Sequence, residues 1–291
     1  MKNYMLRIGI LTFFVLITAC KFDKSVSKNF NTSISTEGDG LSAGEVYLST
    51  DAERLDDNVF IYGQKIYTNF ENMDGFVIEN DKYYAKMGVE VISESGEVVM
   101  QSNNLLDSSA GLDASLRTLF GELILAQPMH SGAKYTASYD ISDERGEGTF
   151  TSTMDFEILP NPNITVKESG LKAQEIYIFN TDSKSVITNS ETQFGDNLQF
   201  QFEGLEGYTL VDGFVALGLS IKVEDARGKQ ILYNKNAFEN TLITEAQIAQ
   251  GVGGTLVFSK GMINNPVTWE VEIWDVNSDA RLKGTTQLKV N

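Results

Sequence analysis

The chain has 291 residues, of which 42% are hydrophobic and 22% are charged. These proportions exclude a collagen-like or wholly disordered protein, and the length suggests about two domains. The net charge of −17 disfavours a nucleic-acid partner, because an acidic surface repels phosphate. The single cysteine allows no intrachain disulfide, and the single histidine allows no multi-histidine metal site.

The start of the chain has the composition of a secretory signal peptide. Lys2 and Arg7 give a positive start, residues 8–17 form an apolar run, and small residues follow it. An apolar run of about ten residues is too short to cross the roughly 30 Å hydrocarbon core of a bilayer as a helix. The sequence therefore predicts that residues 1–19 are a signal peptide.

The four residues that end this segment, Ile17-Thr18-Ala19-Cys20, resemble the lipobox of bacterial lipoproteins. The resemblance implies cleavage before Cys20, a covalent lipid on its thiol and attachment to a membrane. An aspartate after the cysteine would retain such a protein in the inner membrane, and Lys21 stands there instead. The resemblance thus implies the bacterial outer membrane, with the periplasmic or surface leaflet left open.

Residues 20–43 carry the cysteine and a polar stretch with isolated apolar residues and no sustained periodicity. Such a segment buries too little apolar surface to offset the entropy of ordering it. We therefore expect a flexible tether that holds the folded part away from the bilayer.

The remaining chain contains an internal repeat. From Gly63 onward the sequence matches itself without gaps at one constant offset, which places Gly96 on Gly228 and Gly121 on Gly253. A repeat this long indicates tandem domains, which we expect at residues 44–160 and 163–291.

Both copies are dominated by alternation of apolar and polar residues, as in residues 135–141 and 267–273. This period indicates half-buried strands, and Gly, Asn and Asp clusters separate them. The predicted fold is therefore all-β, with two tandem antiparallel β-sandwich domains. The pattern resembles the immunoglobulin-like sandwiches of bacterial surface lipoproteins.

One short connecting helix is expected in each copy. Thr244 and Gln247 form a capping-box pattern for a helix over residues 244–250. Residues 113–120 occupy the corresponding place in the first copy and end, like the other segment, at a glycine.

The chain offers no pattern typical of catalysis. His130 lies in an expected loop, and no Gly-x-Ser-x-Gly or phosphate-binding glycine motif is present. Paired carboxylates can hydrolyse glycosides, but 40 acidic residues supply such pairs by chance. We therefore expect no enzymatic activity, with a carboxylate-based hydrolase as the least favoured alternative.

Two acidic turns at corresponding positions of the repeats are candidates for calcium, because oxygen-rich loops bind this ion. Their residues are Asp143 and Glu144 in the first copy, and Asp275 and Asp279 in the second. Solvated turns are the simpler interpretation, and no other cofactor is expected.

Three aromatic residues are candidates for ligand binding. Trp274 falls on the polar side of its strand, and Tyr83 and Tyr84 lie on opposite sides of theirs, so that one of them can be exposed. Exposed aromatic rings stack on sugars or anchor protein partners. Alternatively, Trp274 packs against the joint between the domains or a neighbouring sheet.

The leading functional hypothesis is an outer-membrane-anchored lipoprotein with a non-enzymatic role in binding, adhesion or assembly. The alternative is a glycan-binding accessory lipoprotein of an uptake or degradation system. The expected partners are the membrane, through the lipid, and a protein or a glycan, but no nucleic acid. Oligomeric state and ligand identity stay open.

Overall fold

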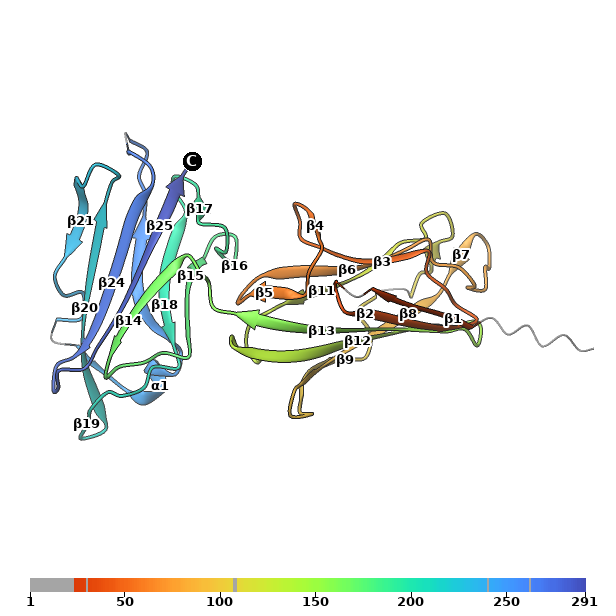
Figure 1. The fold of residues 1–291 in the computed structure, drawn as a ribbon, viewed down its shortest axis with the longest axis horizontal. Coiled ribbons are helices and arrows are strands. Elements are labelled where there is room, and N and C mark those ends of the chain that lie inside the picture. Colours follow the sequence, from red (N-terminus) through yellow and green to blue (C-terminus); the bar gives the residue numbers. More distant parts are fainter. Residues whose placement is uncertain (1–23, 30, 107–108, 240, 262) are drawn as a thin grey trace, which may run out of the picture.

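The computed structural model describes residues 24–29, 31–106, 109–239, 241–261 and 263–291. The expected signal peptide and Cys20 lie outside these residues. Within them the chain forms 25 strands and one short helix, so the prediction of an all-β fold is confirmed. The strands form two sandwiches (Figure 1), and each of them encloses its own hydrophobic core. In the described part of the chain, no helix is long and apolar enough to span a bilayer.

The first sandwich is made of two facing sheets. The larger sheet has the order β1 (Lys24–Asn29), β2 (Ile34–Asp39), β13 (Thr149–Leu159), β12 (Ala133–Asp143), β8 (Ala85–Ser93) and β9 (Val98–Ser102), with β5 (Val59–Ile61) beside β13. The smaller sheet has the order β11 (Leu119–Ile124), β6 (Lys65–Glu71), β3 (Glu45–Ser49) and β4 (Arg54–Leu55). A short pair, β7 (Lys82–Tyr83) and β10 (Leu112–Asp113), lies outside these sheets.

The second sandwich repeats this plan. Its larger sheet has the order β14 (Ile164–Ser169), β25 (Arg281–Val290), β24 (Val267–Asp275), β20 (Phe214–Glu224) and β19 (Leu210–Val211), with β17 (Glu191–Thr192), β21 (Gln230–Asn234) and β22 (Leu242–Ile243) attached. Its smaller sheet has the order β16 (Ser185–Val186), β15 (Glu175–Asn180), β18 (Asn197–Glu203) and β23 (Val252–Val257).

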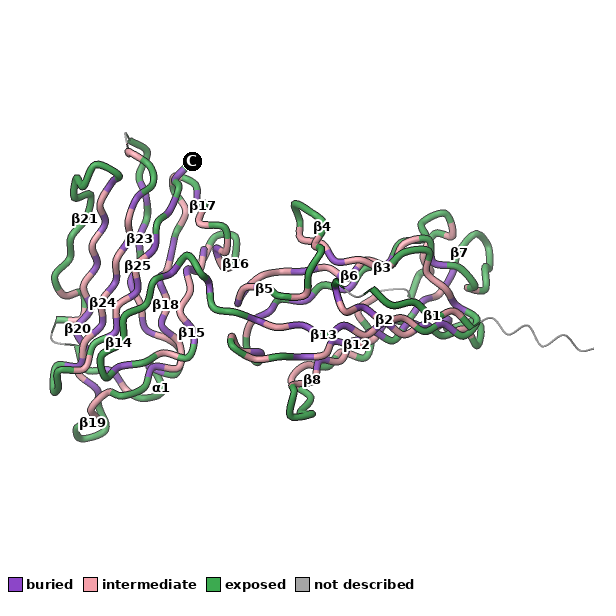
Figure 2. Tube along the Cα trace, viewed as in Figure 1, coloured by how far each residue is buried: buried purple, intermediate pink, exposed green. Residues whose placement is uncertain are grey.

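Alternation of side chains explains why these segments form the cores. Along β24 every second residue is buried, from Val267 to Asp275, and the residues between them are half-exposed. Trp269 is fully buried, and its ring meets Phe200 of the opposite sheet edge to face at 5.3 Å between centroids. Figure 2 shows this alternation of buried and less buried positions along the strands.

The structural repeat follows the same offset as the sequence repeat. β6 and β18 begin and end at residues that this offset relates, and so do β9 and β21. The offset also relates two loop contacts: the Val77 amide donates to Asp143, and the Thr209 amide donates to Asp275. Sequence matching and long-range hydrogen bonding thus identify the same equivalence.

The prediction of a flexible tether is wrong for the described residues between 24 and 43. β1 pairs with β2 along its whole length, and β2 pairs with β13. Ile34 and Leu41 are buried in the first core. Main-chain hydrogen bonds to an existing sheet order a strand that contains few apolar side chains, which is why composition alone misjudged this segment.

The expected helix is present in the second copy only. Helix α1 (Glu245–Ile248) has Thr244 as its N-cap, and the capping box with Gln247 is formed. Residues 113–120 are not helical, so that prediction is wrong. There Asp113 Oδ1 accepts hydrogen bonds from the Ser115 amide at 2.8 Å and hydroxyl at 2.7 Å, a local arrangement that competes with helix formation.

Candidate functional site

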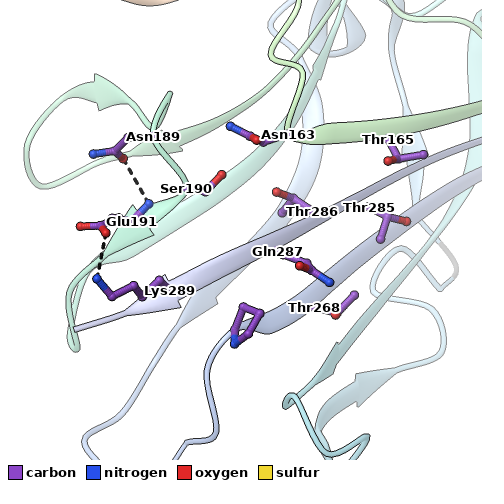
Figure 3. Close-up of a pocket in the computed structure, with 11 residues that line it drawn as sticks. Asn163, Thr165, Asn189, Ser190, Glu191, Thr268, Thr285, Thr286, Gln287 and Lys289 are labelled. Atoms are coloured by element: carbon purple, nitrogen blue, oxygen red, sulfur yellow. Dashed lines mark hydrogen bonds and ion pairs between the residues drawn. The ribbon is translucent and has the colours of Figure 1, made fainter.

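A polar concavity of about 580 Å³ lies on the second sandwich, on the outer face of the β14–β25–β24 sheet, which points away from the core. We call it the polar cup (Figure 3). Hydroxyl and amide side chains dominate its lining: Asn163, Thr165, Ser190, Thr268, Thr285 and Gln287.

Strand register brings the residues of the polar cup together. Thr165 of β14 lies opposite Thr285 of β25, and Thr268 of β24 lies opposite Gln287. Each of them alternates with inward-facing residues, so that all four side chains emerge on the same face. No hydrogen bond joins these four side chains to one another or to other described residues, which leaves their donors and acceptors available to a ligand.

The charged groups at the rim compensate each other. Lys289 Nζ lies 3.0 Å from Glu191 Oε1, and Asn189 Oδ1 accepts a hydrogen bond from the Glu191 amide (Figure 3). The hydrogen bond and charge of Lys289 hold the pKa of the Glu191 carboxyl below its usual value. Since this pair is exposed, it contributes little to stability. The polar cup is therefore close to electrically neutral.

Trp274 lies where its strand pattern placed it, on the outer face of β24 with Glu270 and Glu272. It is half-buried, because its indole covers the backbone of Gly218: a Cβ atom there would lie 2.0 Å from Trp274 Cε2. The Arg281 guanidinium lies 6.0 Å from the ring. Trp274 shares a face with Thr268 of the polar cup, about 20 Å along the strand.

The two adjacent tyrosines have different environments. Tyr83 is buried, with 3% exposure, and its hydroxyl donates to the Leu116 carbonyl at 2.8 Å. Burial raises the pKa of this hydroxyl. The assignment of Tyr83 to ligand binding is therefore wrong. Tyr84 is half-exposed, and the Arg145 guanidinium covers its ring at 4.5 Å.

The acidic turns use their buried carboxylates to hold loops in place. Asp143 accepts from the amides of Val77 at 2.7 Å and Arg145 at 2.9 Å. Glu144 and Asp279 are exposed beside their turns. The described residues contain no cluster of three or more candidate metal ligands. The geometry thus gives Asp143 a structural role and lends no support to the calcium assignment.

Asp275 plays the same part in the second copy. It accepts from the Thr209 amide at 3.0 Å, the Ser278 hydroxyl at 2.7 Å and the Asn277 amide at 3.0 Å. Burial by itself would raise the pKa of the Asp275 carboxyl, but the hydrogen bonds from these three residues outweigh it, and the pKa lies below its usual value.

The junction between the sandwiches contains a buried acid that sequence patterns did not reveal. Glu175 at the start of β15 has a side chain that is 2% exposed, and it accepts from the Ser131 amide of the first sandwich at 2.8 Å. His130 Nδ1 lies 3.5 Å from the same carboxylate, so this histidine is not an ordinary exposed loop residue. The rings of Tyr62 and Tyr177 also meet here, 5.5 Å apart.

The polar cup was also missed, because Thr, Asn and Gln alternating with core residues have no distinctive pattern in a sequence of strands. The sequence shows only the loss of one charge: Gln287 of β25 stands at the outward position where the first copy has Asp155, whereas Thr285 and its equivalent Thr153 are both uncharged.

No protein-family model and no curated protein matches the chain. Among solved structures, the chain is similar to the fibronectin(III)-like modules of Clostridium thermocellum CbhA, with 11% identity and a TM-score of 0.20 over 84% of this chain and 94% of that chain. It is also similar to Bacteroides uniformis beta-glucuronidase, with 9% identity and a TM-score of 0.25 over 78% of this chain and 26% of that chain. Scores this low identify neither a family nor an activity.

Proposed function

We propose that the chain is a non-enzymatic binding lipoprotein of a bacterial outer membrane, anchored through a lipid on Cys20. The lipobox pattern at residues 17–20 supports the anchor. The first sandwich begins only a few residues after Cys20, so it serves as the spacer, and the second sandwich presents the ligand-binding surface.

The polar cup is the observation that carries the binding role. Four side chains from three adjacent strands converge there, and none has a hydrogen-bond partner among the described residues. Hydroxyl and amide groups bind ligands by hydrogen bonding and have no acid–base function near neutral pH. A surface of this chemistry holds a polar ligand without transforming it.

Comparison of the two copies supports a role for the second sandwich in particular. Thr136 and Asp155 occupy, in the first copy, the places of Thr268 and Gln287. The Thr136 hydroxyl donates to Asp155 Oδ1 at 2.7 Å, so these two side chains are already hydrogen-bonded to each other. The corresponding residues of the polar cup, Thr268 and Gln287, are uncharged, and their side chains have no hydrogen-bond partner among the described residues.

A glycan is the ligand class that this chemistry favours. Neutral sugars present many hydroxyl groups, and sites for them combine hydroxyl and amide partners with an aromatic surface. The polar cup supplies the first, and Trp274, about 20 Å along the same face, supplies the second to an oligosaccharide long enough to reach both. A neutral glycan also avoids the repulsion that the acidic chain would exert on anionic ligands.

Binding to a glycan array tests this function. The probe is the mature chain, residues 20–291, with Cys20→Ser to keep it free of lipid. We expect binding to a neutral glycan that weakens at least tenfold in Thr268→Ala/Gln287→Ala, since two hydrogen bonds to the ligand are lost. Trp274→Ala should weaken it further.

Thr136→Ala is the matched control, because it removes the same hydroxyl from the first sandwich and should leave binding unchanged. Equal loss in both variants would contradict the assignment to the polar cup, and turnover of a bound glycan would contradict a non-enzymatic role. The anchor is tested separately: a fatty-acid analogue should label the native chain and not Cys20→Ser.

A further inference from the structure

The two sandwiches differ at one sheet edge. In the first, β2 lies between β13 and β1, so β1 covers the edge of the sheet. In the second, β14 occupies the place of β2 beside β25, and no described strand pairs with its other side. Residues 165–169 of β14 are all exposed, and Figure 2 shows them as an exposed strip. Among the described residues, the second copy thus lacks a counterpart of β1.

The register of the uncovered edge can be read from the first copy. Lys167 of β14 corresponds to Glu37 of β2, because Glu37 lies opposite Thr151 of β13 and Lys167 lies opposite Lys283, the counterpart of Thr151 in β25. In the first copy Val26 of β1 faces Glu37. An incoming strand in the same register would therefore place its third residue opposite Lys167.

The charge at one outward position of the edge is inverted between the copies. The outward residues of β2 include Glu37 and Asp39, and Asp39 faces Lys24 of β1. In β14 the place of Glu37 is taken by Lys167, and its neighbour Lys283 is already 2.7 Å from Glu270. Lys167 is left beside a like charge, which a carboxylate on an incoming strand would relieve.

Val166, next to Lys167, indicates which second side chain an incoming strand should carry. Val166 lies on the opposite side of β14 and is 38% exposed, whereas its equivalent Thr36, which lies opposite Ser27 of β1, is partly buried. An apolar residue opposite Val166 would bury this side chain and extend the second core.

We propose that the uncovered edge of β14 binds an extended segment of a partner protein, which adds antiparallel to β14 as a further strand. The segment carries a carboxylate opposite Lys167 and an apolar residue opposite Val166. Main-chain hydrogen bonds supply the attachment, and these two side chains supply the specificity. This inference goes beyond the proposed glycan-binding role, because it names a protein partner for a different surface of the second sandwich.

Charge argues against β1 of a second copy as the occupant. The outward residues of β1 are Lys24, Val26 and Lys28, and this pattern is complementary to the acidic β2. On β14 it would place no carboxylate opposite Lys167.

A designed peptide tests the edge. Its sequence is that of residues 22–31 with Val26→Glu and Ser27→Val, which places a carboxylate opposite Lys167 and an apolar residue opposite Val166. Fluorescence anisotropy with the mature Cys20→Ser chain should show saturable binding. Lys167→Glu should weaken binding about tenfold, and a peptide with Val26→Lys should restore it in that variant.

Two controls distinguish strand addition from nonspecific electrostatic attraction between the peptide and the chain. Lys235→Glu makes the same change in charge beyond β21, far from β14, and should leave binding unchanged. A peptide methylated on alternate backbone nitrogens cannot complete the hydrogen bonds and should not bind. Absence of binding by the designed peptide, or equal weakening by the two lysine variants, would overturn the proposal.

Cross-linking locates the bound strand. A peptide with cysteine at the position of Val26 should form a disulfide with Lys167→Cys in the Cys20→Ser chain. Preferential cross-linking to Glu37→Cys would mean that the peptide displaces β1, and it would also overturn the proposal. These outcomes do not depend on the lipid or on glycan binding, so failure here is distinguishable from failure of the proposed function.

Discussion

At the scale of single residues, Asp143 and Asp275 show that a buried carboxylate can act as a structural acceptor in each copy of a repeat. Each accepts the amide of a residue 66 positions earlier in the chain. In each copy this hydrogen bond joins the loop before β8 or β20 to the turn at the end of β12 or β24. The sequence showed the equivalence of these aspartates, but not their burial, because acids in turns are ordinarily solvated.

Replacing Asp275 tests this role. Asp275→Asn should lower the unfolding free energy of the second sandwich by about 2 kcal/mol at pH 7, since hydrogen bonds to a charged acceptor are lost. Both tryptophans, Trp269 and Trp274, lie in this sandwich, so fluorescence during urea denaturation reports on it alone. Asp279→Asn, an exposed neighbour, should have little effect, and equal effects would contradict the assignment.

The same carboxyl predicts a dependence on pH. Its folded-state pKa lies below its unfolded value of about 3.9, so the stabilisation is fully present above that value and is lost as the pH falls through the folded-state pKa. We expect the native second sandwich to lose stability below about pH 4 more steeply than Asp275→Asn does. Parallel pH profiles of the two proteins would contradict this linkage.

At the scale of elements, alternation predicted the long strands and their repetition in two copies, because a half-buried strand must alternate. It failed where main-chain pairing rather than side-chain burial decides the structure. β1 is exposed at all but one position, so its pattern is that of a tether, and only the free edge of β2 makes it a strand. β14 is the opposite case: no described strand pairs with its outer edge, and the sequence pattern does not show this.

Hydrogen bonds made by the polar residues at the start of each segment decided whether the predicted helix forms. Thr244 and Gln247 satisfy each other's backbone, and a helix forms. Asp113 instead caps a turn with Ser115, and Leu119 enters β11. The apolar spacing of the two segments was similar, but the polar residues at their starts differ.

Gly38 lets β1 lie against β2, and its replacement tests this element. A Cβ atom there would lie 2.1 Å from the Leu41 carbonyl oxygen and 2.7 Å from Ser25 Oγ. Gly38→Ala should therefore loosen β1, and hydrogen exchange of residues 24–29 should become faster while β14 is unchanged. Gly261→Ala, at an exposed position with open surroundings, is the control. Unchanged exchange in β1 would contradict the close packing.

At the scale of the whole molecule, the junction decides whether the second sandwich is held at a defined angle. β15 and β16 face the end of the first sandwich (Figure 1), and a cavity of about 330 Å³ between them is lined by residues of both, including Tyr62 and Tyr177. Glu175 is the buried charged group of this contact. A tandem repeat in the sequence predicts two domains, but it carries no information on how they dock.

Titration of Glu175 should make the docking depend on pH. Burial raises the pKa of this carboxyl, and the Ser131 hydrogen bond and the His130 charge offset the shift only in part. The docked state therefore binds a proton more tightly than the separated state, and docking should weaken as the pH rises above about 4.3, the ordinary pKa of a glutamate. Small-angle X-ray scattering should show a larger maximum dimension at the higher pH.

Glu175→Gln is the variant for this experiment, because the amide keeps an acceptor for Ser131 and removes the charge. Its scattering should show little change over the same range, with the sandwiches docked throughout. A native chain that is insensitive to pH, or a variant as sensitive as the native chain, would contradict the role of this carboxyl. Glu203, which accepts a hydrogen bond from the Tyr177 hydroxyl at the same junction, is unchanged in both proteins.

Gly63 offers the sharpest test of the junction, because the repeat supplies its own control. Gly63 has a φ of +82°, and a Cβ atom there would lie 2.3 Å from Val186 Cγ2 across the junction. Its equivalent, Gly195, has a φ of +97° and open space around it. Alanine at either site strains the backbone by about 1–2 kcal/mol, but only Gly63→Ala also forces the sandwiches apart.

Gly63→Ala should therefore increase the maximum dimension in scattering and expose residues 160–163 to proteolysis, whereas Gly195→Ala should only lower the stability of the second sandwich. If both variants keep the native scattering profile, the close contact between Gly63 and Val186 does not hold the molecule together. In that case the second sandwich would present its polar cup and its uncovered edge on a mobile arm. Docking instead fixes the direction in which both surfaces face.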